Sequence, residues 1–181
     1  EPWARDVLSD RGILGTTVLL FERDGDTIHD PNGWRTECLA SVTVHDLPPT
    51  AQYLDGSHLR LWDELALLDR PFAQALSSHE REIEVWVNVL RQEGLLSPVD
   101  APTPTQITVA MHRLLSRAPS RLLCLSLVDG VGDLNTQNQP GTDQEYPNWR
   151  VPLTDERGEP VLIEELADSS LLRTLVRSLS R

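Results

Sequence analysis

Three short apolar segments, rich in leucine and β-branched residues, alternate along this chain with longer segments of helical periodicity. We predict buried strands over residues 16–21, 38–44 and 122–128, because short apolar runs are typical of strands that are covered on both faces. A chain in which strands and helices alternate folds into an α/β domain with a parallel sheet. The sequence therefore predicts an α/β fold, and its 181 residues are enough for one domain with a real core.

Helical segments are expected between and around these strands. The clearest one covers residues 79–94, where Ile83, Trp86 and Leu90 recur at the spacing of one helix face and Gly94 marks the end. Residues 22–35 are polar and are interpreted as a long loop. The other helices are expected at residues 2–12, 57–68 and 107–115, and at residues 162–179 with a break near Asp168.

Polar residues follow each predicted strand. Glu22 follows the first strand, His45 and Asp46 follow the second, and Asp129 follows the third. In barrels of alternating strands and helices, functional groups gather at the C-terminal ends of the strands, and substrate often meets the loops that come next. Three strands cannot close such a barrel, so the pattern leaves two interpretations, a small open sheet or part of a larger chain.

Residues 138–150 carry an unusual run of polar and aromatic side chains that no helix or strand requires. A Pro-Gly pair within the run indicates a turn. Around it, the amide of Asn138 and the rings of Tyr146 and Trp149 offer hydrogen bonds to hydroxyls and flat apolar faces for a sugar ring. The run therefore predicts a polyol-binding surface, and the alternative is a surface loop whose Trp149 only fills a gap in the core.

The charge of the chain argues against several classes of partner. It has 16 basic and 28 acidic residues, a formal net charge of −12. We therefore expect no nucleic acid and no anionic membrane surface as partner, whereas neutral sugars are indifferent to this charge. No apolar run approaches the length of a membrane span, and the first residues do not resemble a signal peptide, so a cytoplasmic location is expected.

The two cysteines, Cys38 and Cys124, both lie in apolar segments that are predicted to be strands. There a reduced, buried thiol acts as a small hydrophobic side chain. A disulfide between them requires the two strands to lie side by side. Because no Cys or His cluster has the spacing of metal ligands, we expect no metal site and no cofactor.

Two motifs in this chain resemble those of the amylomaltases, the 4-α-glucanotransferases that disproportionate maltodextrins. Residues 138–150 resemble the Asn-x-Pro-Gly loop and the Pro-Asn-Trp-Arg sequence of that family. Residues 42–49, Val-Thr-Val-His-Asp-Leu-Pro-Pro, resemble its strand-end Thr-His-Asp motif, and residues 12–22 resemble the preceding strand. The resemblance covers nearly the whole chain, with a less diagnostic helical middle.

The resemblance implies that the chain is the C-terminal portion of a (β/α)8 TIM barrel, with strands six to eight and no separate second domain. It also implies transfer of α-1,4-glucan segments between maltodextrins by a retaining double displacement. The family's nucleophilic Asp and its acid/base Glu lie upstream of Glu1, so the missing N-terminal part of the enzyme is an expected partner. This chain alone would then be inactive.

Roles for individual residues follow from the same resemblance. Asp46 matches the family's third carboxylate, which stabilises the transition state by hydrogen bonds to sugar hydroxyls, and His45 would donate to a hydroxyl in the same subsite. Asn138 matches a substrate-facing Asn, whereas Tyr146 and Trp149 either stack on glucose or anchor the loop. A histidine tied to a neighbouring carbonyl is the alternative for His45. Glu22, at the end of the first predicted strand, completes the candidate substrate-binding residues.

The sequence departs from the family pattern at Val44, where the family usually has Thr, and at residues 127–130, where an acidic residue or Gln usually precedes the Asp. Rival functions belong to other classes. A noncatalytic α-glucan-binding module would use the same aromatic and amide groups, and an α-glucan hydrolase would differ only in whether water or a sugar hydroxyl attacks. The third rival function is that of a protein interaction domain without catalytic activity, suggested by the acidic segments around residues 80–84 and 164–165.

Overall fold

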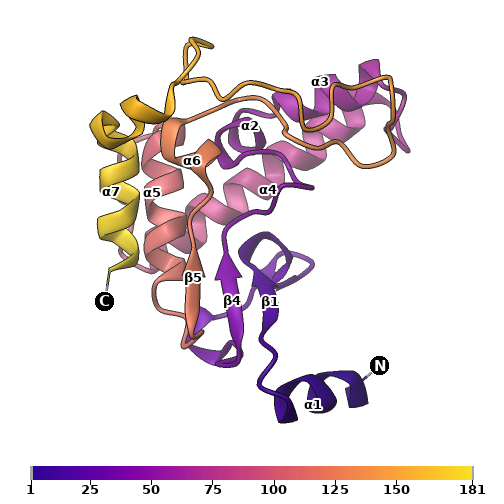
Figure 1. Ribbon diagram of the computed structural model, residues 1–181. Helices are drawn as coiled ribbons and strands as arrows, with labels where there is room; N and C mark the ends of the chain where they lie inside the picture. The colour runs from indigo at the N-terminus through magenta and orange to yellow at the C-terminus, as the bar shows by residue number, and fades with distance from the viewer. Residues whose placement is uncertain (1, 181) are drawn as a thin grey trace.

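A parallel three-stranded sheet forms the centre of the computed structural model, which describes residues 2–180. Strand β4 (Cys38–Ser41) lies between β1 (Gly15–Val18) and β5 (Leu122–Cys124) (Figure 1). Leu39 of β4 is in register with Thr16 on one side and with Leu122 on the other. The predicted α/β fold with a parallel sheet is confirmed.

All three strands are shorter than the sequence predicts. After β1, residues Leu19–Phe21 form a 3-10 helix, which the backbone N–H of Glu22 closes by donating to the Leu19 carbonyl at 3.1 Å. After β5, residues Leu127–Val131 form the short helix α6. The prediction failed there because a short apolar run has no readable period, so a buried helical turn and a strand look alike.

The prediction that Asp129 lies at the end of a strand is therefore wrong. Asp129 belongs to α6 and is only 2% exposed. Its carboxylate is part of the interior rather than of the edge that a substrate could reach.

The two cysteines are free and lie on neighbouring strands. Cys38 is buried as predicted, and its thiol donates to the Arg35 carbonyl at 3.0 Å. Cys124 is exposed, contrary to the prediction, because it lies on β5 at the margin of the sheet. The strand register places Cys124 opposite Ser41 and not opposite Cys38, which explains why neighbouring strands do not bring the thiols together.

The segment predicted as a long loop contains a small hairpin. Strands β2 (Arg23–Asp24) and β3 (Thr27–Ile28) pair antiparallel around Gly25, whose φ of 57° lies in the left-handed region that glycine adopts without strain. A 3-10 turn, Pro31–Gly33, follows and is capped by the side chain of Asp30. Two-residue strands are too short to leave a pattern in the sequence.

Most of the predicted helices are present. The helix expected at residues 79–94 starts earlier, and the predicted break near Asp168 separates a 3-10 segment from the last helix. One short helix directly after Pro49 was not predicted, and the stretch that was expected to be helical from Ser57 to Leu68 ends at Glu64. The helices are α1 (Pro2–Asp10), α2 (Thr50–Asp55), α3 (Ser57–Glu64), α4 (Phe72–Gln92), α5 (Pro104–Leu115), α6 (Leu127–Val131) and α7 (Ser170–Leu179), with the 3-10 segment η3 (Ile163–Asp168).

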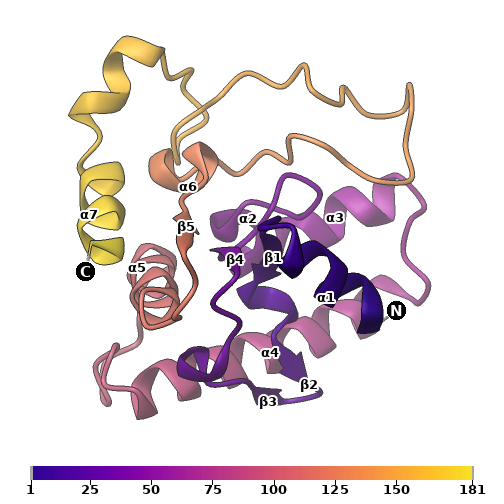
Figure 2. The same cartoon turned by 60° about the horizontal axis from the view of Figure 1, so that its bottom comes forward.

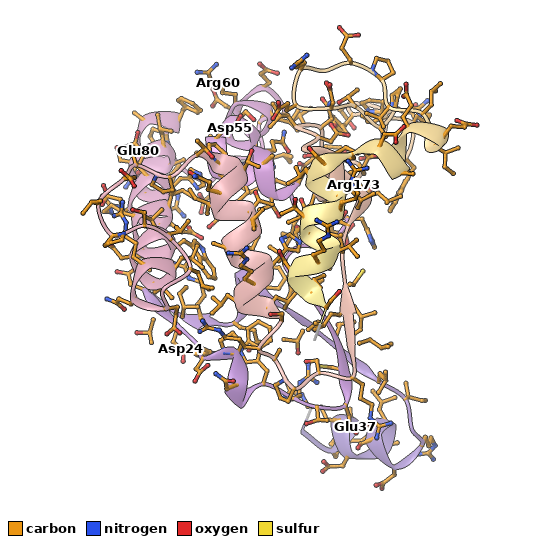
Figure 3. All side chains as sticks on the ribbon, turned by 90° about the vertical axis from the view of Figure 1, so that its left-hand side faces the viewer. Asp24, Glu37, Asp55, Arg60, Glu80 and Arg173 are labelled. Carbon is orange, nitrogen blue, oxygen red and sulfur yellow. The ribbon has the colours of Figure 1, made fainter. Side chains whose placement is uncertain are left out.

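Helices α4 and α5 cover one face of the sheet, and α7 packs beside α5 (Figures 1 and 2). The core between these layers is formed by fully buried side chains that include Trp86 of α4, Met111 of α5 and Ala40 of β4. Figure 3 views the helical layer from outside, where charged side chains such as Glu80 and Arg173 point away from the core. Within the described residues, the helices are too short or too polar to cross a membrane.

The margins of the sheet generate a prediction for the chain on its own. Within the described residues, β1 and β5 each pair with a strand on one side only, and Leu122 of β5 is 50% exposed. Unpaired strand edges promote association between chains. We expect the isolated 181-residue chain to self-associate or to unfold without a sharp transition, as measured by light scattering and by circular dichroism during heating. A monomer that unfolds cooperatively would contradict this expectation.

Candidate functional site

Asp46 lies in a tight turn that follows the central strand. Its turn is closed by the N–H of Leu47, which donates to the Val44 carbonyl at 3.0 Å. The hydroxyl of Thr43 donates to the Pro48 carbonyl at 3.1 Å and fixes the far side of the turn. The His45 and Asp46 side chains are 59% and 52% exposed, so a ligand can reach both from solvent.

Four of the predicted site residues meet at this turn, although two of them come from a distant segment. The Asn138 side-chain amide donates to Asp46 Oδ1 at 2.6 Å, across 92 positions of sequence. His45 Nε2 lies 3.5 Å from the same oxygen. The rings of His45 and Trp149 have centroids 5.0 Å apart and planes tilted by 52°. The structure thus brings together Asp46, His45, Asn138 and Trp149, which we call the Asp46 cluster.

Trp149 contributes an exposed ring to the cluster. Trp149 is 64% exposed. The alternative interpretation, in which Trp149 fills a gap in the core, is therefore wrong. Its φ of 61° is unusual for a residue other than glycine, and such strain persists only where the surrounding structure enforces it. Here the Trp149 N–H donates to the Gln137 carbonyl at 2.9 Å.

Tyr146 anchors the loop instead of presenting its hydroxyl to solvent. The hydroxyl donates to the Thr136 carbonyl at 2.6 Å. Burial of the ring, and then the nearby negative charge of Asp133, raise the pKa of Tyr146 above its usual value. Of the two roles that the sequence left open, the anchoring role is the one that these contacts support.

Glu22 has its closest charged neighbour outside the Asp46 cluster. Its carboxylate lies 3.7 Å from His29 Nδ1, next to the small hairpin. The carboxylate of Asp24, and after it that of Glu22, raise the pKa of His29. The prediction that Glu22 lies at the end of a strand is wrong, because β1 ends at Val18 and the 3-10 helix Leu19–Phe21 lies between them. The contacts of Glu22 belong to the hairpin.

Several residues that the sequence did not single out hold the loop in place. Asn148 joins two points of the loop, because its Oδ1 accepts from the Gln139 N–H at 2.7 Å and its Nδ2 donates to Thr142 Oγ1 at 2.9 Å. The indole of Trp62 on α3 donates to Gln139 Oε1 at 2.9 Å. In the sequence, the only signal for these roles was that Asn148 and Gln139 lie within residues 138–150.

A cavity of about 330 Å³ adjoins the turn that carries Asp46. Leu47, Pro48, Phe21, Tyr53 and Trp62 are among its lining residues. No group of three or more potential metal ligands occurs among residues 2–180. The chemistry that this part of the molecule offers is therefore hydrogen bonding to hydroxyls by a carboxylate, an amide and an imidazole, beside an exposed aromatic ring.

Comparison with known proteins connects this chain to one family. The family described as 4-alpha-glucanotransferase matches residues 1–156. A 4-alpha-glucanotransferase from Mycobacterium tuberculosis (strain ATCC 25618 / H37Rv) is 47% identical over 183 residues, covering 98% of this chain and 25% of the relative. One from Haemophilus influenzae is 24% identical over 154 residues, covering 78% of this chain and 21% of the relative.

A solved structure is also similar over the whole chain. The crystal structure of amylomaltase from Corynebacterium glutamicum superposes with a TM-score of 0.86 at 36% identity, covering 100% of this chain and 27% of that one. The chain thus spans about a quarter of the length of the relatives that it matches.

The contacts of Asn148 predict how firmly the loop is held. Asn148→Ala removes the hydrogen bonds of the Asn148 side chain to Gln139 and Thr142, each worth about 1 kcal/mol, so the loop should open more often. We expect trypsin to cleave after the exposed Arg150 roughly 5 to 30 times faster than in the unchanged protein. Mass spectrometry of the digest measures this. Gln144→Ala, at an exposed position of the same loop, is the control, and equal cleavage of both variants would show that Asn148 does not hold the loop.

Proposed function

Because the chain belongs to the 4-alpha-glucanotransferase family, we propose that it is part of an enzyme that transfers α-1,4-glucan segments between maltodextrins. In this proposal, Asp46 stabilises the transition state of the transfer. The observation that carries it is the direct contact between Asp46 and Asn138, two residues that were singled out separately as substrate-facing. The maltodextrin is the substrate, and the rest of the longer enzyme is the partner.

The position of the sheet in the whole enzyme is part of the proposal. We assign β1, β4 and β5 to strands six, seven and eight of a (β/α)8 barrel, and residues 1–181 to one segment of its catalytic domain. Two observations support this assignment. The strands pair in chain order and in parallel, as in such a barrel, and the two outer strands each have a side without a strand partner among the described residues.

Asp46 is suited to bind a sugar hydroxyl. Within the described residues, its contacts with Asn138 and His45 both involve Oδ1, so Oδ2 can accept a hydrogen bond from a hydroxyl. A hydrogen bond to an ionised carboxylate strengthens as positive charge develops on the sugar ring, as in the oxocarbenium-like transition state of glycoside cleavage. This difference between ground state and transition state is what accelerates the reaction.

The other members of the cluster place the sugar. Asn138 holds the Asp46 carboxylate in one orientation, which lowers the cost of arranging it at the moment of reaction. His45 can donate to a second hydroxyl, and the exposed ring of Trp149 offers a flat surface to the apolar face of a glucosyl unit. The nucleophile and the acid/base, which lie about 5 Å apart in retaining enzymes, would come from the rest of the enzyme.

The first test concerns the chain alone. If the nucleophile and the acid/base lie elsewhere, the isolated 181-residue chain should not convert maltotriose into glucose and longer dextrins. Chromatography of the products after prolonged incubation measures this, with the complete enzyme as the positive control. Disproportionation by the isolated chain would contradict the proposed division of catalytic groups.

The second test concerns Asp46 in the complete enzyme. Asp46→Asn keeps the size of the side chain but loses its charge, which removes roughly 3 to 4 kcal/mol of transition-state stabilisation in a preorganised site. We expect kcat to fall by about two to three orders of magnitude, with a much smaller change in KM.

Asp63→Asn, the same substitution at an exposed position of α3, is the matched control. It should leave kcat unchanged. If Asp46→Asn also kept normal kcat but weakened dextrin binding, the cluster would be a noncatalytic glucan-binding site instead.

A further inference from the structure

Asp46 is connected to helix α2 by a short and stiff link. Two buried prolines, Pro48 and Pro49, precede Thr50, the first residue of α2. Because the proline ring fixes φ, this link has few free torsions. The place where α2 starts therefore determines where the Asp46 carboxylate lies.

A buried carboxylate from a distant helix fixes that place. Asp129 Oδ1 accepts from the Thr50 N–H at 2.7 Å, and Asp129 Oδ2 accepts from the Thr50 hydroxyl at 2.8 Å. Asp129 is 2% exposed and Thr50 is 0% exposed. Each oxygen of the carboxylate is thus matched to one donor of the same residue, across 79 positions of sequence. A hydrogen bond to a charged group in such a dry environment is stronger than one at the surface.

His112 of α5 also lies next to the Asp129 carboxylate. Its Nδ1–H donates to the Thr108 carbonyl at 2.8 Å, and its Nε2 lies 3.8 Å from Asp129 Oδ2. Burial raises the pKa of Asp129 and lowers the pKa of His112, because a dry interior disfavours both charged forms. Burying a carboxylate in this environment costs free energy unless its oxygens accept hydrogen bonds. Thr50 donates those hydrogen bonds.

Helix α2 also supports the other half of the Asp46 cluster. Gln52 Oε1 accepts from the Thr136 hydroxyl at 2.6 Å, and both residues are buried. Thr136 comes two positions before Asn138, whose amide contacts Asp46. Helix α2 therefore anchors the end of the segment that carries Asp46 and the start of the segment that carries Asn138.

We propose that Asp129 is a positioning residue for the reaction: by binding both donors of Thr50, it fixes the start of α2 and so holds the Asp46 carboxylate in its productive orientation. The inference rests on the proposed function, since it assigns a role relative to Asp46 as transition-state stabiliser. Asp129 itself does not touch the substrate. Its effect should therefore appear in kcat and should depend on the presence of the Asp46 carboxylate.

The test uses the complete enzyme with two substitutions. Thr50→Val keeps the shape of the side chain but loses the hydroxyl donor, and Asp129→Asn loses the charge and one acceptor. Each should lower kcat by about tenfold, the effect of one such hydrogen bond, with KM changed by less than about twofold. Thr50→Ser, which retains the hydroxyl, should restore most of the activity.

Two comparisons separate positioning from general stability. Ser120→Ala removes another buried hydroxyl, which donates to the Arg35 carbonyl before the start of β5, and should lower the melting temperature without lowering kcat. In an Asp46→Asn background, Thr50→Val should cause little further loss of kcat, because residues that act through one another are not additive.

The outcomes distinguish this inference from the proposed function. If the unchanged complete enzyme does not disproportionate maltotriose, the proposed function fails. If it does, the positioning role is wrong when Thr50→Val and Asp129→Asn both keep the kcat of Ser120→Ala. It is also wrong when Thr50→Val lowers kcat equally with and without the Asp46 carboxylate. Should Thr50→Val or Asp129→Asn fail to fold, the other is compared with Ser120→Ala in the same way.

Discussion

The parallel pairing of β4 with both β1 and β5 is the constraint on which the candidate site depends. Because parallel strands all end at the same edge of a sheet, the segments that follow β4 and β5 start side by side, although the chain between these strands contains the four helices α2 to α5. Asp46 follows β4, and the helix that carries Asp129 follows β5. One edge therefore gathers the charged group of the cluster and the buried carboxylate that fixes its support.

The long segment after α6 is ordered by side chains more than by regular secondary structure. Asp133, which is 0% exposed, accepts from Asn135 and from Thr154 at both backbone and side-chain donors, and so ties the two ends of the segment together. Asn148 does the same within the loop. A long loop of this kind is usually functional when it is held so firmly, and its hydrogen bonds explain how Asn138 can be presented to Asp46 at a fixed distance.

Much of the fold and of the site could be predicted, for identifiable physical reasons. Helices such as α5 have a readable period, and its buried face contains Ile107 and Met111 as expected. Asp46 and Asn138 could both be assigned to the site because each lies in a motif that resembles one of the 4-alpha-glucanotransferase family, although their direct contact was not predicted. The burial of Asp129 could not be predicted, since the sequence of a polar residue after an apolar run is the same at a strand end and in a buried helical turn. Its role depends on Thr50, a contact that only the tertiary structure shows.

The central claim is that the Asp46 cluster binds the sugar at which transfer occurs. A crystal structure of the complete enzyme with a bound maltodextrin tests it most directly. We predict a glucosyl unit whose hydroxyls lie within about 3 Å of the Asp46 carboxylate and the Asn138 amide, in hydrogen-bonding geometry. A maltodextrin bound in a catalytically competent position, with Asp46 and Asn138 paired to each other and distant from every sugar hydroxyl, would contradict it.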